Sequence, residues 1–301
     1  MNVKNYRSQF STNLSTIYPK TEIDSFFFIL IDEYLDLQRI DITLNPDFKI
    51  NNENLLVLNR ALERLKNEEP IQYIIGKTEF YGFPFLVDEN TLIPRPETEE
   101  LVEWILLEAE KLKSSNALKS LNILDIGTGS GCIPISLAKK IPAASISAID
   151  VSIGALKIAK KNAALNNVKI EFIEANILHT DHLNIFADSS TLSNSNFKNK
   201  FNIIVSNPPY VRELEKREIQ NNVLQNEPHL ALFVSNENPL IFYNKIADLA
   251  KQNLTKDGLL FFEINQYLGQ ETLKILTEKG FKNIELLKDL FGNERMIKAS
   301  I

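Results

Sequence analysis

The chain is poor in several residue types, and each scarcity excludes something. Its 301 residues include a single cysteine, Cys132, so no disulfide can form within the chain and a reducing compartment is favoured. The three histidines form no cluster with carboxylates or with this thiol, which argues against a metal site. The most apolar early run, residues 26–31, is too short to span a bilayer, and residues 1–10 lack the apolar core of a signal peptide. A cytoplasmic protein that binds neither metal nor membrane is therefore expected.

The chain also lacks an excess of positive charge. Its 33 basic and 39 acidic residues give a net charge of −6, which offers no electrostatic footprint for a phosphate backbone. This argues weakly against a duplex DNA substrate, because a local basic groove can exist within an acidic total. Hydrophobic residues at 44% and charged residues at 24% are ordinary for a globular protein. The length predicts one large domain or two smaller ones.

Residues 1–75 carry the pattern of a small helical domain. Apolar residues recur at helical spacing after Thr21–Asp24, a segment that resembles a capping box. Asn52 is suited to cap a further helix that is rich in leucine, and Pro70 lies just past its end. This part of the chain has no phosphate or metal signature, so we interpret it as a domain that recognises a partner.

Residues 76–95 are expected to form a β-hairpin that links this domain to residues 96–301. The stretch from Tyr73 to Val87 is rich in β-forming residues with turn residues between them. A helix is expected to begin at Pro96, because a proline next to acidic residues is typical of a first helical turn. The polar residues 113–120 are predicted to connect this helix to the next strand.

From residue 121 onward, strand and helix patterns alternate, which is typical of a parallel sheet covered by helices on both faces. Predicted strands cover residues 121–126, 145–150, 169–173, 201–206 and 258–264, and predicted helices lie near residues 131–140, 153–166, 240–254 and 269–279. Two last strands, near residues 283–287 and 295–300, flank a short turn and are expected to pair antiparallel. The segment 188–200, rich in serine and asparagine, is predicted to be a surface loop.

The first predicted strand runs directly into a glycine-rich loop of Gly127, Thr128, Gly129, Ser130 and Gly131. Glycines in this place let the backbone turn sharply and approach a ligand without an intervening Cβ, whereas a plain βα turn needs only one glycine. A dinucleotide site requires a sixth-position glycine, where this chain has cysteine, and a P-loop requires a Gly-Lys-Ser/Thr ending that is absent. The loop therefore favours a nucleoside without a pyrophosphate, as in S-adenosylmethionine.

Other polar residues follow neighbouring strands. Asp150 closes the second strand, where an acid can accept hydrogen bonds from both ribose hydroxyls of a nucleoside; a solvated strand-end aspartate is the alternative. After the third strand, Asn176 can bond the exocyclic amine of an adenine and Ile177 can cover its ring. Together with Asn207 these residues lie at carboxyl ends of strands, the edge at which open α/β sheets bind ligands. One crevice can then hold a methyl donor and its acceptor.

Asn207, Pro208, Pro209 and Tyr210 follow the apolar strand 201–206 and suit methylation of a planar nitrogen. Each proline fixes its own φ, extends the residue before it and offers no N–H, so the turn presents acceptors. The Asn207 side-chain oxygen and the Pro208 carbonyl can accept both hydrogens of an NH₂ group, while Tyr210 covers its flat face. Because the lone pair of such a nitrogen is delocalised, these bonds return electron density to a poor nucleophile. The alternative is an ordinary Pro-Pro strand terminator.

Three further features each allow two interpretations. Arg95 and Glu97 can position a substrate or the entry loop, or they can serve in a structural ion pair. Glu227 and Pro228 can line the acceptor channel or form a plain turn. Cys132 opens a helix, where a thiolate can be favoured, but a small buried packing residue is the preferred interpretation.

Together these motifs resemble those of the bacterial protein-(glutamine-N5) methyltransferases that act on peptide chain release factors. The resemblance extends from about Glu69 to Ser300 and is carried by residues 69–76, 92–99, 123–133, 206–210, 227–228 and 289–295. The Pro-Arg-Pro-Glu-Thr-Glu segment at 94–99 discriminates, because the Asn-Pro-Pro-Tyr motif is shared with DNA adenine and rRNA guanine methyltransferases. Residues 1–68 match only in helical character.

The resemblance implies an α/β fold: a Rossmann-like class I methyltransferase sheet with an antiparallel C-terminal strand, preceded by a small helical domain. It implies methyl transfer from S-adenosylmethionine to the glutamine amide nitrogen (N5) of the Gly-Gly-Gln motif in release factors, which tunes translation termination. The helical domain would contact the release factor.

The residue roles follow by position. The cofactor residues implied are Gly127, Thr128, Gly129, Ser130, Gly131, Asp150, Asn176, Ile177 and Asn207. Asn207, Pro208, Pro209 and Tyr210 would hold the glutamine, with Asn207, Pro208 and Tyr210 catalytic. Position 176 is Asn where the family commonly has Asp, and position 177 is Ile where an aromatic residue often stacks, so adenine binding departs from the family pattern.

We hypothesise direct in-line transfer without a covalent enzyme intermediate or a metal. The main rival is a nucleic-acid methyltransferase acting on adenine N6 or guanine N2, although the chain has no basic segment resembling a target-recognition domain. A non-catalytic binding module is a second rival, which the intact motifs disfavour. The expected partner is a release factor, with no direct nucleic-acid binding, and the chain is expected to act as a monomer.

Overall fold

The structure, a computed structural model, describes residues 1–116, 120–181, 183 and 200–301. The chain forms two compact units: Met1–Lys77 with Gln220–Asn226, and Thr78–Ile219 with Glu227–Ile301. The surface loop predicted at residues 188–200 lies, apart from Lys200, outside the described residues. Within the described part of the chain, no helix combines the length and the apolar character needed to cross a bilayer.

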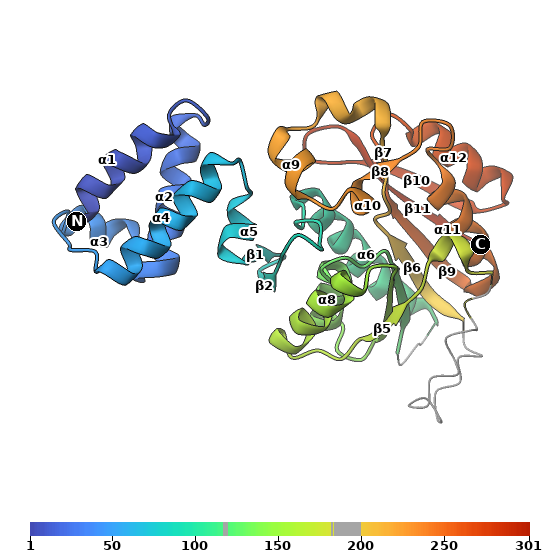
Figure 1. Cartoon of the computed structure of the whole chain (residues 1–301). Coiled ribbons are helices and arrows are strands. Elements are labelled where there is room, and N and C mark those ends of the chain that lie inside the picture. Colours follow the sequence, from blue (N-terminus) through green and yellow to red (C-terminus); the bar gives the residue numbers. More distant parts are fainter. Residues whose placement is uncertain (117–119, 182, 184–199) are drawn as a thin grey trace. The chain divides into compact units, whose positions relative to one another are not determined.

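The first unit is a helical domain, as predicted (Figure 1). Its helices are α1 Val3–Leu14, α2 Lys20–Leu35, α3 Arg39–Leu44, α4 Asn52–Lys66, α5 Ile71–Ile75 and, from much later in the chain, α9 Asn221–Asn226. Apolar side chains three or four positions apart point inward and form its core. Phe10, Phe27, Leu30 and Leu58 are each at most 1% exposed.

Two helix starts differ from the prediction. The capping box predicted at Thr21–Asp24 is wrong, because α2 begins at Lys20 after Pro19 and no side chain caps it. Asn51, not Asn52, caps α4: its Oδ1 accepts a hydrogen bond from Asn54 N at 2.8 Å. Two adjacent asparagines offer the same capping group, so only the backbone path decides which one is used.

The predicted hairpin consists of β1 Lys77–Phe80 and β2 Phe83–Leu86. Tyr81 and Gly82 between them both have positive φ, 52° and 74°, as a type I′ turn requires. The β structure predicted before it is wrong, because residues 71–75 form α5. Gly76 ends that helix in the left-handed conformation (φ 73°), and its N–H donates to the Gln72 carbonyl.

The second unit is built on a seven-stranded sheet of order β10-β11-β9-β6-β3-β4-β5. Its strands are β3 Asn122–Ile126, β4 Ser145–Asp150, β5 Glu171–Glu174, β6 Phe201–Ser206, β9 Leu254–Glu263, β10 Lys282–Lys288 and β11 Glu294–Ser300. The pairs from β5 to β9 are parallel, and β11 pairs antiparallel with both β9 and β10. This confirms the predicted parallel sheet with an antiparallel end. Only β9 departs clearly from its predicted bounds, since it begins at Leu254 instead of residue 258.

Helices cover both faces of this sheet, as predicted. They are α6 Pro96–Asn116, α7 Cys132–Lys140, α8 Ile153–Leu165, α11 Ile241–Asn253 and α12 Gly269–Glu278. Because α6 continues to Asn116, the polar connector predicted from Lys113 starts as helix. Short elements that the sequence did not predict join the rest: η1 Ile177–His179, β7 Val211–Arg212, η3 Glu213–Glu218, α10 His229–Leu232 and β8 Phe233–Val234.

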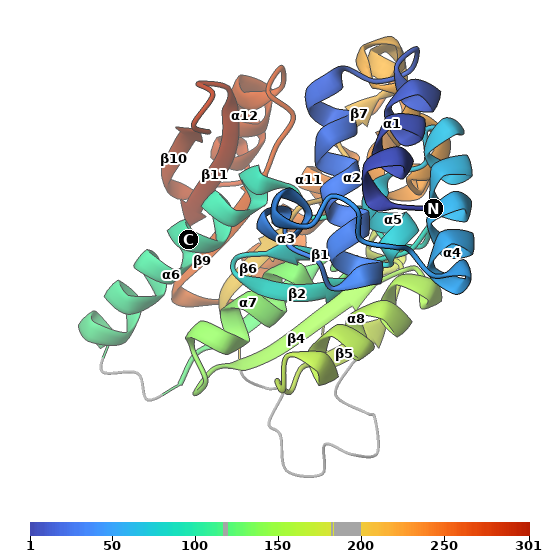
Figure 2. The ribbon, with the colours of Figure 1, turned by 90° about the vertical axis from the view of Figure 1, so that its left-hand side faces the viewer.

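Strand alternation sorts the core into two layers. In β6, Ile203 and Val205 pack with α6 and α7, whereas Ile204 between them packs with α11. Figure 2 shows α6, α7 and α8 along the sheet. Continuous apolar strands are thus explained by helices on both faces.

The strand order reverses next to β3. From β3 the chain proceeds through β4 to β5 on one side, and then returns to β6 on the other side of β3. Helices diverge at such a reversal and leave a crevice at the carboxyl ends of the two strands. Gly127 and Asn207 follow those two ends directly.

Candidate active site

The glycine loop connects β3 to α7. Gly127, Gly129 and Gly131 all have positive φ, at 78°, 54° and 82°, a conformation that residues with a side chain rarely adopt. A Cβ added to Gly129 would meet nothing within 4 Å, so this backbone faces open space. A Cβ on Gly131 would lie 3.0 Å from Ile135 Cδ1 and 3.2 Å from Ala159 Cβ, which shows close packing against α7 and α8. The loop therefore exposes bare backbone on one side and packs tightly on the other.

Asp150, at the end of β4, braces this loop. Its Oδ2 accepts a hydrogen bond from Gly129 N at 2.8 Å, and its Oδ1 accepts from Ser152 N at 2.9 Å. Burial raises the pKa of Asp150 above its ordinary value, although these backbone donors oppose the rise. Each oxygen keeps a lone pair, so the carboxylate can still accept from a ligand.

Asn176 and Ile177 follow β5. Asn176 Oδ1 accepts from Leu178 N at 3.0 Å and so caps the short helix η1. Ile177 is 7% exposed. Because the only side-chain oxygen of Asn176 accepts this hydrogen bond, its side-chain N–H groups are the ones available to donate to a ligand.

One cavity of about 230 Å³ in the second unit collects most of the predicted site residues. They are Gly127, Thr128, Gly129, Ser130, Asp150, Asn176, Ile177, Asn207, Pro208 and Pro209. Gly131 and Tyr210 are not among the described residues that line it. The cavity thus joins the glycine loop, the ends of β4 and β5, and the Asn-Pro-Pro turn.

The Asn-Pro-Pro-Tyr turn is fixed beside the glycine loop. Ser206 Oγ donates to the Ile126 carbonyl at 2.6 Å, which ties the ends of β6 and β3 together. Asn207 Nδ2 donates to Thr98 Oγ1 at 3.4 Å, and the Tyr210 hydroxyl donates to Glu263 Oε1 at 3.1 Å. Asn207 therefore turns its amide nitrogen towards α6, and Tyr210 turns its hydroxyl towards the end of β9.

Arg95 forms an ion pair, but with Glu227 instead of its neighbour Glu97. Arg95 Nη2 lies 2.7 Å from Glu227 Oε1, whose side chain is 1% exposed and also accepts from Ile93 N at 3.2 Å. Arg95 and Pro228 both line the cavity. The pair thus closes one wall of the cavity with two segments that are far apart in the chain.

Two residues that the sequence did not single out connect these parts. Thr98 lies in the first turn of α6, inside the Pro-Arg-Pro-Glu-Thr-Glu segment, and Glu263 is the last residue of β9. Both are buried, and Thr98 Oγ1 donates to Glu263 Oε2 at 2.7 Å. Burial raises the pKa of Glu263, while hydrogen bonds from Thr98 and Tyr210 oppose the rise. An acid at the end of an apolar strand, the signal that singled out Asp150, also marks Glu263.

A third residue that was not singled out is Asp125 in β3. Its carboxyl group is fully buried, and neither oxygen has a hydrogen-bond partner among the described residues. Burial raises its pKa to about 7; the nearby Thr128 hydroxyl lowers the pKa, and the negative charge of Asp150 raises it further. Asp125 is 0% exposed and is not among the described residues that line the cavity, so it lies behind the glycine loop and not on its open side.

Other chemistries find no support in the described residues. No group of three or more histidine, cysteine, aspartate or glutamate side chains there could hold a metal ion. His179 and His229 lie in this part of the chain, and His182 lies outside it. Cys132 borders the cavity, but burial raises the pKa of its thiol to about 12, which disfavours a reactive thiolate.

The fold and the family models agree on the class of protein. The Methyltransferase small domain family matches residues 105–232, and the PrmC N-terminal domain family matches residues 8–76. The solved structure of the hMettl16 catalytic domain in complex with the MAT2A 3'UTR hairpin 6 aligns with a TM-score of 0.53, covering 83% of this chain and 82% of that chain at 14% identity. The second unit is thus a class I methyltransferase fold.

Relatives in sequence define the family more narrowly. A release factor glutamine methyltransferase from Flavobacterium psychrophilum is 56% identical over 300 residues, covering 100% of this chain and 99% of the relative. One from Bacteroides thetaiotaomicron is 38% identical over 96% of each chain, and one from Lactococcus lactis is 44% identical over 83% of this chain and 84% of the relative. The chain belongs to the release factor glutamine methyltransferase family.

Proposed function

We propose that this protein transfers a methyl group from S-adenosylmethionine to the side-chain amide nitrogen (N5) of the glutamine in the Gly-Gly-Gln motif of a peptide chain release factor. The names of its relatives support this reaction. One structural observation carries it: a Cβ placed on Gly127 would lie 3.9 Å from the Asn207 carbonyl oxygen, so the glycine loop and the Asn-Pro-Pro turn meet at one cavity. We place the reaction in the cytoplasm, where release factors act on the ribosome.

The residues present fit the methyl donor. Asp150 accepts hydrogen bonds and suits the ribose hydroxyls, and the exposed backbone at Gly129 leaves room for a close approach. Ile177 offers an apolar surface and Asn176 offers N–H donors for the adenine ring. When bound, S-adenosylmethionine supplies a methyl group made electrophilic by its sulfonium.

The acceptor side requires a pair of oxygen atoms. The hydrogen bond from Asn207 to Thr98 uses Nδ2, so it leaves Asn207 Oδ1 available. The next oxygen in the turn is the Pro208 carbonyl, and the two prolines have no N–H that could compete with the substrate for these acceptors. Both oxygens can accept hydrogen bonds from the glutamine NH₂ group. These bonds place negative charge next to a nitrogen that becomes positive as it is methylated, and they hold it in attack geometry. The proton lost afterwards passes to solvent.

A labelled-methyl assay tests this function. Purified protein is offered a release factor, the same release factor with the Gly-Gly-Gln glutamine replaced by glutamate, ribosomal RNA and DNA in parallel. Label is expected only on the unaltered release factor, and mass spectrometry should place it on the glutamine side-chain nitrogen. Label on RNA or DNA alone would instead establish the nucleic-acid alternative.

A further inference from the structure

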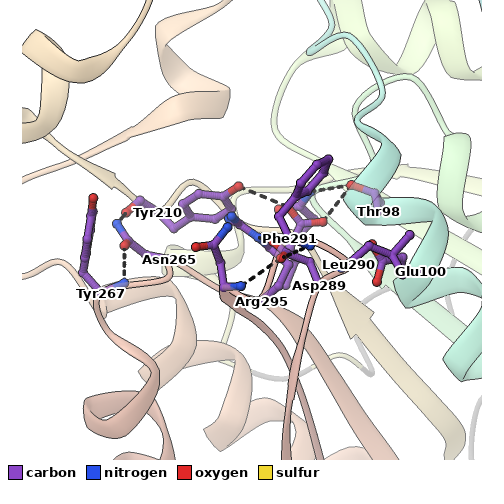
Figure 3. A network of polar contacts seen from close by, with 12 residues as sticks. Thr98, Glu100, Tyr210, Asn265, Tyr267, Asp289, Leu290, Phe291 and Arg295 are labelled. Carbon is purple, nitrogen blue, oxygen red and sulfur yellow. Dashed lines mark hydrogen bonds and ion pairs between the residues drawn. The ribbon is translucent and has the colours of Figure 1, made fainter.

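The Glu263 side chain connects two parts of the proposed acceptor site. It is 1% exposed and accepts hydrogen bonds at both oxygens, from Thr98 Oγ1 at 2.7 Å and from the Tyr210 hydroxyl at 3.1 Å. In Figure 3 these contacts converge between Thr98 and Tyr210. One carboxyl group at the end of β9 therefore binds a residue of α6 and a residue of the turn after β6.

The direction of these hydrogen bonds determines the orientation of a third group, the side-chain amide of Asn207. A carboxylate only accepts, so the single Thr98 hydroxyl proton is directed at Glu263. The Thr98 oxygen is then left to accept, and Asn207 Nδ2 donates to it at 3.4 Å. The Asn207 amide must consequently turn its nitrogen to Thr98 and its oxygen away.

The reverse orientation of the Asn207 amide would defeat the proposed acceptor site. Its oxygen would face the Thr98 oxygen with no proton between them. Its NH₂ group would face the NH₂ group of a substrate, donor against donor. The two orientations have nearly the same shape, so packing alone does not distinguish them.

Tyr210 is held to the same strand end. Its hydroxyl donates to Glu263, and its backbone carbonyl accepts from Asn265 Nδ2 at 2.9 Å. The Tyr243 hydroxyl donates to the Glu263 carbonyl at 3.2 Å, which fixes the backbone of the acid as well. Both ends of the Asn-Pro-Pro-Tyr turn thus depend on Glu263, through Thr98 at one end and directly at the other.

We propose that Glu263 is a positioning residue for the methyl transfer: through Thr98 it orients the Asn207 amide as an acceptor for the substrate NH₂ group, and it anchors Tyr210 directly. This inference rests on the proposed function. Neither Glu263 nor Thr98 takes part in a covalent bond that is made or broken in the reaction. Their effect is expected in kcat, because they set the geometry around the nitrogen and not the affinity for a whole protein.

Thr98 provides the sharpest test, because valine has the same shape without the hydroxyl. Thr98→Val is expected to lower kcat about tenfold to a hundredfold, the size of effect expected from a misplaced reacting group. The KM for the release factor and the affinity for S-adenosylhomocysteine should each stay within about threefold. Thr98→Ser keeps the hydroxyl and should recover most of the lost kcat. The matched control is Thr272→Val in α12, which removes a fully buried hydroxyl bonded to the Leu268 carbonyl; it should leave kcat unchanged.

Glu263→Gln tests the acid itself. A glutamine can direct its NH₂ group at Thr98, which then directs its proton at Asn207 and reverses that amide. A loss of kcat of about tenfold is therefore expected with the KM little changed. Thermal unfolding of every variant without ligand establishes that the loss does not come from unfolding.

A second readout does not depend on catalysis. The side-chain ¹⁵N–¹H signals of Asn207, assigned by their loss in Asn207→Ala, report the donor bond to Thr98. They should shift in Thr98→Val and keep their positions in Thr98→Ser. Unshifted signals in Thr98→Val, or a kcat within twofold of wild type in that folded variant, would overturn the proposal. If the unaltered protein methylates no release factor, the proposed function fails, and the amide signals still decide the arrangement around Glu263.

Discussion

The backbone carbonyl of Asn207 lies beside Gly127, 3.9 Å from where a Cβ of that residue would stand. The two residues are 80 positions apart, but β3 and β6 are neighbours in the sheet and end at the same edge. The loop that would hold a methyl donor is thus in contact range of the turn that would hold its acceptor, and the positive φ of Gly127, 78°, is what favours glycine there. This proximity is the reason that we expect donor and acceptor to share one cavity.

Asn207→Ala removes the proposed acceptor oxygen. We expect kcat to fall about 10²–10³-fold, because one preorganised polar contact to developing charge is typically worth that much. Affinity for S-adenosylhomocysteine, measured by calorimetry, should change only mildly. Near-normal turnover of a release factor by the purified variant would refute the role given to Asn207.

Gly129→Ala places a methyl group on the open side of the glycine loop, where nothing lies within 4 Å. It should weaken S-adenosylhomocysteine binding by at least about tenfold, since the added Cβ occupies the space in which the ligand would contact the backbone of the glycine loop. Gly82→Ala is the matched control: it also has positive φ (74°) and open space around its Cβ, but lies in the β-hairpin turn. Both variants should lose a similar stability of about 1 kcal/mol. Equal binding by both would contradict the placement of the cofactor.

Asp125 should make stability depend on pH. Burial raises its pKa to about 7, above the ordinary value of 3.8, so the folded protein holds this proton more tightly than the unfolded chain does. Its favourable contribution is complete below about pH 4 and is lost as pH rises to about 7. A shift of about three pKa units corresponds to at most about 4 kcal/mol.

Asp125→Asn cannot ionise and removes this dependence. Urea unfolding without ligand should show the variant gaining stability relative to wild type between pH 5 and pH 8. Asp257→Asn, at an exposed position in β9, is the control and should follow wild type at both values. A constant difference between wild type and Asp125→Asn across this range would show that Asp125 does not titrate as its burial predicts.

Arg95 and Glu227 should be coupled in stability. Arg95→Met leaves the Glu227 carboxylate, with a side chain only 1% exposed, without its cation and should cost about 2–3 kcal/mol. Adding Glu227→Gln should recover part of this loss, so a double-mutant cycle should give a coupling energy above about 1 kcal/mol. Glu63→Gln in the exposed Glu63–Lys66 pair is the control and should change stability by less than about 0.5 kcal/mol. Strict additivity at Arg95 and Glu227 would count against a structural ion pair.

The parts of the fold that follow from local chemistry were predictable. Continuous apolar strands and periodic helices predicted the parallel sheet, and β4 and β6 have the predicted bounds. Local patterns failed where two outcomes had similar local energies. Residues 73–76 are apolar and β-branched enough for a strand, but Gly76 ends a helical turn there. The short elements between β6 and α11 carry no period long enough to recognise.

The candidate site divides in the same way. The glycine loop, Asp150 and the Asn-Pro-Pro-Tyr turn were recognisable because each depends on residues adjacent in sequence. Glu263 was not recognised, because the predicted strand 258–264 placed it inside the strand, whereas β9 ends at Glu263. Its partners Thr98 and Tyr210 also come from distant parts of the sequence.

The sequence by itself determined where the backbone lacks side chains and where it is extended. Glycine has no Cβ and permits positive φ, whereas proline fixes φ and has no N–H, and both effects act within a few residues. Only the tertiary structure decided which way the Asn207 amide faces. That choice depends on Thr98 and Glu263, which are 165 positions apart and meet because α6 packs beside the end of β9. Whether a buried group donates or accepts a hydrogen bond depends on its partner in space. That partner cannot be read from the order of residues along the chain.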